Sequence, residues 1–236
     1  MANFLDGRLA LVTGASRGIG AATAEGLAAA GAHVVLTART AADLEGVEER
    51  IHAAGGSATI APLDLTESDS IAKLASAIGG RWNALDVLVL NAAMLGSLTP
   101  VPQIDGQEFG KLLTLNVLAQ QALIAAFDPL LRRSAAGRLL AVTSSVGADP
   151  RPFWGAYGAS KAALETLVLS YGEEVRNLAP LKVAIVDPGA TATKMRARAF
   201  PGEDQAALKP PSAVAEAIVA LLGDDFETGR RLELGR

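Results

Sequence analysis

The sequence predicts an α/β protein built on a parallel β-sheet that helices cover on both faces. Short runs of β-branched and aliphatic residues alternate along the chain with longer, Ala- and Leu-rich segments of helical period, which is the pattern of repeated βα units. The short runs are almost continuously apolar, as strands buried on both faces require. A length of 236 residues suits one compact domain of this class, so we expect residues 1–236 to form a single domain.

The apolar runs predict seven strands, at residues 9–13, 33–37, 57–63, 87–91, 138–144, 182–186 and 231–234. Helical periodicity between them predicts helices at residues 18–30, 41–54, 67–79, 106–131, 157–177 and 212–221. The least regular segment, residues 190–211, carries Pro201, Gly202, Pro210 and Pro211. It follows the carboxyl end of a strand, where ligands of open α/β sheets bind, so we expect a substrate lid there.

Composition excludes several classes of protein. The 21 Lys and Arg residues against 25 Asp and Glu residues give a net charge of −4, which argues against a nucleic-acid-binding protein. The longest unbroken apolar run has six residues, whereas a bilayer span needs about 20, so no membrane span is expected. The first seven residues lack the regions of a signal peptide and the chain has no Cys, which favours a cytoplasmic location. Two His residues without companion ligands predict neither a metal site nor a Ser-His-Asp triad.

A glycine-rich turn joins the first predicted strand to the first predicted helix. It reads Gly14-Ala15-Ser16-Arg17-Gly18-Ile19-Gly20. Glycines let the backbone approach a pyrophosphate, and the helix N-terminus points N–H groups at it. The turn therefore predicts a dinucleotide site, with a tight turn that binds no ligand as the alternative.

The residue at the end of the second strand indicates which dinucleotide the site prefers. A site that prefers NAD has an Asp or Glu about 20 residues beyond the glycines, to bind the ribose 2′-hydroxyl. Here Arg39 occupies that strand end, and its guanidinium suits a 2′-phosphate, with Arg17 as a second cation. We therefore predict NADP (NADPH) rather than NAD, although a solvated charge is the alternative for Arg39.

Four further side chains predict acid–base chemistry. Tyr157 and Lys161 are spaced i, i+4 and share one helix face, where an ammonium is expected to lower the pKa of the phenol. Tyr157 would then donate a proton to a carbonyl oxygen or accept one from an alcohol. Ser144, at the end of the fifth strand, would hold the substrate oxygen, and Ser145 is the competing residue. Asn116 lies in an apolar helix, and a bond to a backbone carbonyl is its simpler explanation.

These motifs, with Asn91-Ala92-Ala93 and Pro188-Gly189 in the same order, resemble those of the short-chain dehydrogenases/reductases over nearly the whole chain. The resemblance implies a single doubly wound, Rossmann-type domain with a seven-stranded parallel sheet and hydride transfer between NADP(H) and a carbonyl or alcohol. It further implies that Tyr157 is the proton donor, that Lys161 lowers its pKa and binds the nicotinamide ribose, that Ser144 orients the carbonyl, and that Asn116 supports a water relay to Lys161.

The resemblance also implies cofactor contacts along the chain. Asp64 would receive the adenine amino group, Leu65 would border the ring, Asn91 would steady the central strand, and the Pro188-Gly189 turn and Thr193 would meet the carboxamide. Motifs and resemblance together place cofactor contacts at Gly14, Ser16, Arg17, Gly18, Ile19, Gly20, Arg39, Asp64, Leu65, Asn91, Ala92, Tyr157, Lys161, Pro188, Gly189, Thr191 and Thr193. One departure is Ala93, where the family commonly has Gly, and it predicts a modest loss of cofactor affinity.

The pocket walls predict the substrate only broadly. Phe153, Trp154, Met195 and Phe200 favour an apolar or aromatic carbonyl, whereas Arg151, Arg196 and Arg198 would suit an anionic tail. The extra apolar faces of helices 106–131 and 157–177 predict a homodimer or homotetramer. A catalytically silent NADP-binding regulatory protein is the main alternative to a reductase, and it is disfavoured because both Tyr157 and Lys161 are present.

Overall fold

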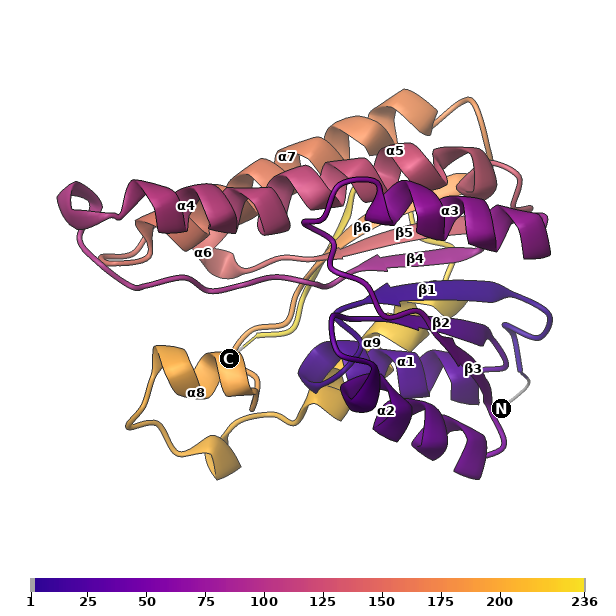
Figure 1. The fold of residues 1–236 in the computed structure, drawn as a ribbon, viewed down its shortest axis with the longest axis horizontal. Helices are drawn as coiled ribbons and strands as arrows, with labels where there is room; N and C mark the ends of the chain where they lie inside the picture. Colours follow the sequence, from indigo (N-terminus) through magenta and orange to yellow (C-terminus); the bar gives the residue numbers. More distant parts are fainter. Residues whose placement is uncertain (1–2, 236) are drawn as a thin grey trace.

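In a computed structural model that describes residues 3–235, the seven predicted strands form one parallel sheet in the order β3-β2-β1-β4-β5-β6-β7 (Figure 1). The strands are β1 (Leu9–Thr13), β2 (His33–Thr37), β3 (Ser57–Ile60), β4 (Val87–Leu90), β5 (Gly137–Val142), β6 (Leu181–Asp187) and β7 (Arg230–Glu233). The chain builds outward from β1 to β3, returns to the middle of the sheet, and builds outward again from β4 to β7. This reversal confirms the doubly wound fold. Met1, Ala2 and Arg236 lie outside the described residues. They are the ends of the predicted domain, and Met1 and Ala2 also begin the segment that was compared with a signal peptide.

Helices cover both faces of the sheet (Figure 1). The α-helices are α1 (Gly18–Ala29), α2 (Ala41–Ala53), α3 (Ser70–Arg81), α4 (Gly106–Leu113), α5 (Ala119–Leu131), α6 (Ser145–Ala148), α7 (Gly155–Val175), α8 (Lys194–Ala199) and α9 (Pro211–Gly223). Helices α1, α2 and α9 pack on one face and α3, α5 and α7 on the other. Alternate residues of β1 therefore face opposite cores, with Ala10 and Val12 in one and Leu9 and Leu11 in the other.

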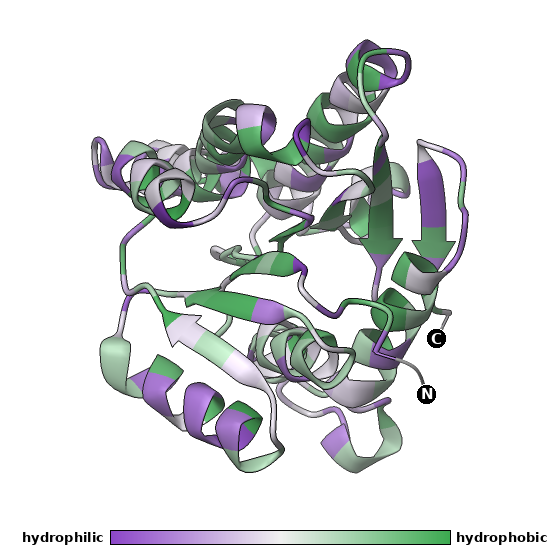
Figure 2. Cartoon of the chain, turned by 90° about the vertical axis from the view of Figure 1, so that its right-hand side faces the viewer, coloured by the Kyte–Doolittle hydropathy of each residue, from purple (hydrophilic) through white to green (hydrophobic). Residues whose placement is uncertain are grey.

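Hydropathy follows this layering. Figure 2 shows the inner strands as mostly hydrophobic, while hydrophilic residues gather on outward-facing helix surfaces and on β7. Strand β7 lies at the edge of the sheet and begins with exposed Arg230 and Arg231. The cores are thus confined to the two interfaces between sheet and helices, and the strand ends remain free to form a site.

The ends of several elements differ from the sequence prediction. The strand predicted at 57–63 ends at Ile60, although the Ala61 and Leu63 amides still donate to carbonyls of β2 and the residue after it. The helix predicted at 67–79 begins only at Ser70, because Asp69 before it has a left-handed backbone with φ of 61°. The strand predicted at 138–144 ends at Val142, because the short helix α6, which was not predicted, begins at Ser145.

The helix predicted at 106–131 is interrupted by a π-helical turn, Thr114–Leu118, between α4 and α5. Within residues 3–235, Gly106–Leu131 is the one helical stretch that length and composition would allow to cross a membrane. Its residues Leu123, Phe127 and Leu131 are fully buried against the sheet. One side of this stretch therefore packs in the core, and 33% of its apolar window is buried.

The predicted lid is more regular than its sequence indicated. Residues Lys194–Ala199 form α8, and Gln205–Ala207 form a short 3₁₀ turn. A β-bridge between Thr191 and Lys209 closes the base of the segment. The lid is therefore a long loop that the β-bridge closes at its base and that carries α8 across the strand ends.

Candidate active site

A cleft of about 1820 Å³ follows the carboxyl ends of the strands from the glycine turn to the lid. Of the predicted catalytic and cofactor-binding residues, all line this cleft except Gly20 and Asn116. Phe153, expected in the pocket wall, is exposed and does not line the cleft. The strand order reverses between the paired strands β1 and β4, and doubly wound proteins bind ligands beyond the strand ends at this point. Residues that are far apart in the sequence thus converge on one face.

The glycine turn has the backbone that its residues predict. Gly14 and Gly18 have φ values of +64° and +58°, which glycine adopts without strain. A Cβ added at Gly20 would lie 2.3 Å from the Gly14 carbonyl oxygen and 2.4 Å from Asn91 Nδ2, so no side chain fits there. Gly20 therefore shapes the turn from behind the cleft.

Asn91 fastens the glycine turn to β4. Its side-chain amide donates to the carbonyls of Thr13, at 2.8 Å, and Gly14, at 3.2 Å. The Thr13 hydroxyl in turn accepts from the backbone amides of Asn91 and Ala92, at 2.9 and 3.1 Å. These bonds hold the two central strand ends together, which agrees with the steadying role expected of Asn91.

The two predicted phosphate-binding cations have no internal partner. Arg17 and Arg39 are exposed and line the cleft, and neither takes part in a salt bridge or side-chain hydrogen bond within the described part of the chain. Asp64 lies on the same side of the cleft and accepts two hydrogen bonds from Thr66, at 2.7 and 2.9 Å. These bonds, helped by the charge of Arg39, lower the pKa of Asp64. Asp64 therefore remains a carboxylate acceptor close to a free guanidinium.

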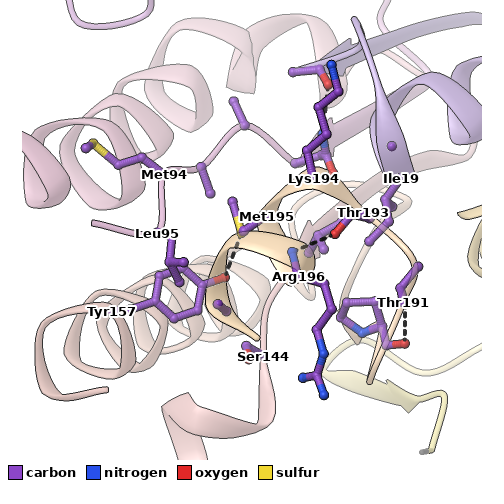
Figure 3. A pocket seen from close by; sticks show the side chains of 18 of the residues that line it. Ile19, Met94, Leu95, Ser144, Tyr157, Thr191, Thr193, Lys194, Met195 and Arg196 are labelled. Carbon is purple, nitrogen blue, oxygen red and sulfur yellow. Dashed lines mark hydrogen bonds between the residues drawn. The ribbon is translucent and has the colours of Figure 1, made fainter. Parts of the chain in front are cut away.

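Tyr157 lies at the other end of the cleft, beneath the lid. Figure 3 shows its hydroxyl pointing to Met195 of α8, and the oxygen-to-sulfur distance is 3.9 Å. Its buried ring packs with Leu95 and Val146 and meets the edge of the Trp154 ring, with 5.9 Å between centroids. Ser144 lines the cleft near this ring (Figure 3). Both hydroxyl-bearing residues therefore line the same cleft.

The expected effect of Lys161 on Tyr157 is wrong for this structure. Burial raises the pKa of Tyr157, and the charge of Asp187 raises it further. Lys161 donates to the Val142 carbonyl at 2.9 Å, and its Nζ lies 5.7 Å from the centroid of the phenol ring. Burial lowers the pKa of Lys161 to about 8, although Glu165 acts in the opposite direction. Desolvation thus outweighs the attraction between ammonium and phenolate.

Asn116 lies in the π-helical turn and is fully buried. Its amide accepts from the Met94 backbone N–H and donates to the Met94 carbonyl, both at 2.9 Å, and it donates to the Ser160 hydroxyl at 3.0 Å. These contacts match the simpler explanation of a bond to a carbonyl. They tie the chain after β4 to α7, and the water relay to Lys161 stays a prediction.

The turn after β6 and the lid use several of their polar groups internally. The Thr191 hydroxyl donates to the Pro188 carbonyl at 3.1 Å, and the Thr193 hydroxyl caps α8 by accepting from the Arg196 amide at 3.1 Å. Arg196 binds Glu203 through two hydrogen bonds of 2.5 Å and stacks on Phe200. The charge of Arg196 is therefore compensated, which weakens its expected role in binding an anionic substrate tail.

Two acidic residues near the site were not among the predicted residues. Asp187 ends β6 and raises the pKa of Tyr157, and Glu165 lies buried on α7 one turn after Lys161. An acidic residue at the end of an apolar strand or inside a buried helix was the sequence signal for each.

Comparisons with known proteins agree with this geometry. Residues 8–204 match the family described as short chain dehydrogenase. The uncharacterized oxidoreductase YciK of Escherichia coli (strain K12) is 37% identical over 226 residues, which cover 94% of this chain and 89% of YciK. A Pseudomonas syringae structure assigned to the short-chain dehydrogenases has a TM-score of 0.95 at 37% identity and covers 99% of this chain and 96% of its own.

A Shigella flexneri 2a (strain 301) protein assigned to the same family was solved in complex with NADP. It has a TM-score of 0.94 at 36% identity, with 99% of both chains covered. Family match, relatives and fold therefore lead to one conclusion. This chain is an oxidoreductase of the short-chain dehydrogenase family.

Proposed function

We propose that this oxidoreductase transfers a hydride between NADPH and a small carbonyl or alcohol substrate, with Tyr157 as its general acid and base. The observation that carries the proposal is the arrangement of the cleft. Tyr157 and Ser144 line one end, and the glycine turn with Arg17 and the nearby Arg39 lines the other, both arginines having no ion-pair partner among residues 3–235. A cleft of this length suits a dinucleotide whose reactive end lies beside the phenol.

The residues present fit NADP. Gly18 lines the cleft with a φ of +58°, and a Cβ added there would lie in van der Waals contact with Thr193 Cγ2, at 3.5 Å, so glycine keeps the turn clear of the lid. Backbone amides at the start of α1 would bind the pyrophosphate, and Arg17 and Arg39 would bind the 2′-phosphate. Asp64 and Leu65 would meet the adenine, while Pro188, Gly189, Thr191 and Thr193 would hold the nicotinamide end. The NADP complex of the Shigella flexneri relative supports this assignment.

In carbonyl reduction, bound NADPH supplies the hydride. The raised pKa keeps the Tyr157 phenol protonated at neutral pH, so it can donate its proton to the substrate oxygen. The Ser144 hydroxyl donates to the same oxygen and stabilises the charge that develops there. The Lys161 ammonium, beside the phenol, stabilises the phenolate that proton donation leaves. In alcohol oxidation the phenolate takes the proton back.

Replacement of Tyr157 tests the chemistry. Tyr157→Phe keeps the buried ring and removes the titrating hydroxyl, so we expect NADPH affinity to stay within about twofold while carbonyl reduction falls by about 10²- to 10⁴-fold. Binding is followed by nicotinamide fluorescence and turnover by absorbance at 340 nm with a pool of ketones and aldehydes. Wild-type activity in the variant would refute the role of Tyr157. Tight NADPH binding by the wild type without turnover of any carbonyl would favour the regulatory alternative.

Replacement of Arg39 tests the cofactor preference. Arg39→Ala removes a charge-assisted contact to the 2′-phosphate, so Kd for NADPH should rise about 10- to 100-fold while Kd for NADH stays unchanged. Arg50→Ala is the matched control, because Arg50 is an exposed arginine on α2 that pairs with Glu25 outside the cleft. Equal losses for NADPH and NADH would contradict the assignment.

We also propose that the protein is a cytoplasmic homodimer or homotetramer. The exposed Leu118 in the π-helical turn supports an additional contact surface along α4, α5 and α7. Light scattering at micromolar concentration measures the mass, and a monomer would contradict the oligomer. Cell fractionation tests the location.

A further inference from the structure

Glu165 is a buried carboxylate for which the proposed chemistry has no role. It lies on α7, four residues after Lys161, so the two side chains share a helix face with Cβ atoms about 5 to 6 Å apart. Its side chain is only 9% exposed. A buried charge of this kind is costly unless it is paired, so its partners matter.

The partners of Glu165 connect it to the end of β5. One carboxylate oxygen accepts a hydrogen bond from the buried hydroxyl of Thr143, and the other accepts from the Arg231 guanidinium of β7 at 2.7 Å. Thr143 stands between two functional positions, since the Val142 carbonyl before it holds Lys161 and Ser144 after it carries the hydroxyl of the site. Glu165 therefore fixes Thr143, the residue that connects the Val142 carbonyl to Ser144.

The other charged groups around this point are few. A cavity of about 70 Å³ behind the site is lined by Glu165, Asp187 of β6, Arg231 and Glu233 of β7, and Asp149 after α6. Lys111 of α4 lines the large cleft, and neither α6 nor the π-helical turn carries a titratable side chain. Tyr157 is the other titratable group on the Lys161 helix face. Among these carboxylates, Glu165 raises the pKa of Lys161 through its charge, although no ion pair joins the two side chains in the described part of the chain.

We propose that Glu165 is a positioning residue that keeps the buried Lys161 charged and fixes the Thr143 peptide between Lys161 and Ser144. This inference rests on the proposed roles of Tyr157, Lys161 and Ser144. Its carboxylate offsets the desolvation of the ammonium, and its bond to Thr143 sets the position of the Val142 carbonyl that Lys161 binds.

The test measures the protonation of Lys161 directly in the full chain. Lysines are labelled with ¹³C at Cε, and the NMR resonance of Lys161, assigned from its loss in Lys161→Met, is titrated with pH. In Glu165→Gln the amide oxygen still accepts from Thr143 but the charge is gone, so the midpoint of Lys161 should fall by about one pH unit. Thr143→Val removes the hydrogen bond but keeps the charge, and Glu174→Gln removes an exposed carboxylate from the same helix. Glu174→Gln should leave the midpoint unchanged, and Thr143→Val, which loosens the peptide that Lys161 binds but keeps the carboxylate, should lower the midpoint by less than Glu165→Gln does.

An unchanged midpoint in Glu165→Gln, or an equal fall in Thr143→Val, would overturn the proposal. If Glu165→Gln does not fold, the double variant Glu165→Met with Arg231→Met removes both partners without leaving either unpaired, and a smaller fall of the Lys161 midpoint is expected because a positive charge is lost together with the negative one. The rate of carbonyl reduction with NADPH is then measured against pH for the wild type and Glu165→Gln. The alkaline fall in rate should move to lower pH by the same amount as the Lys161 midpoint, and an unchanged pH profile would overturn the link to catalysis. A wild-type protein that reduces no carbonyl would refute the proposed function instead, because the NMR midpoint needs no turnover.

Discussion

Burial of Lys161 gives a prediction about stability that does not depend on any substrate. The pKa of Lys161 falls from 10.5 to about 8 on folding because the fold removes the ammonium from water. Between these two values the unfolded chain binds a proton that the folded chain has released, so stability rises with pH. From pH 7 to pH 9.5 the two pKa values give a gain of about 2 kcal/mol for the wild type. Lys161→Met has no such group and should lack this gain.

The assay compares urea unfolding of the wild type and Lys161→Met at pH 7.0 and pH 9.5. Other titrating groups are common to both proteins and cancel, so the difference in unfolding free energy should shift by about 2 kcal/mol in favour of the wild type at the higher pH. The loss of the bond to the Val142 carbonyl is the same at both pH values. Lys73→Met, at an exposed lysine of α3, is the control and should show no shift. If the difference in unfolding free energy does not change with pH, the lowered pKa of buried Lys161 is refuted.

Two further predictions concern the shape of the cleft. Gly20→Ala would place a Cβ 2.3 Å from the Gly14 carbonyl oxygen, so NADPH affinity should fall at least about 10-fold and Tm should fall as well. Gly110→Ala, with no atom within 4 Å of the added Cβ, should bind NADPH normally. Fluorescence titration measures both affinities, and normal affinity in Gly20→Ala would contradict the packing argument. Met195→Ala removes the thioether over the Tyr157 hydroxyl, so kcat/KM for bulky aromatic ketones should rise relative to small ones, with Met94→Ala as the control; an unchanged ratio would show that Met195 does not limit the pocket.

Local spacing accounts for most of what the sequence predicts correctly. The Gly14 and Gly18 conformations, the strand end at Arg39, and the shared helix face of Tyr157 and Lys161 depend on residues within a few positions of one another. The parallel sheet then brings these short segments to one edge, because the carboxyl ends of its strands meet there.

Features that depend on distant packing were not predicted. The pKa of Tyr157 depends on burial by Leu95, Val146 and the lid, which are remote in sequence, and this desolvation reverses the effect expected from Lys161 alone. The π-helical turn likewise places Asn116 in contact with Met94 and Ser160, which are remote in sequence, and the apolar periodicity of residues 106–131 does not encode these contacts.

The contact of Met195 with Tyr157 indicates how the site opens. A substrate oxygen has to approach the phenol to about 2.6 to 3.2 Å, but the Met195 sulfur occupies that side of the hydroxyl at 3.9 Å. Helix α8 itself is held by the Thr193 cap and by the pair of Arg196 and Glu203. A methionine has three rotatable side-chain bonds, so turning Met195 aside requires less rearrangement than lifting the helix. Under the proposed mechanism, entry of a small carbonyl would then require only a rotation of the Met195 side chain, whereas a larger substrate would require the bonds that anchor α8 to break.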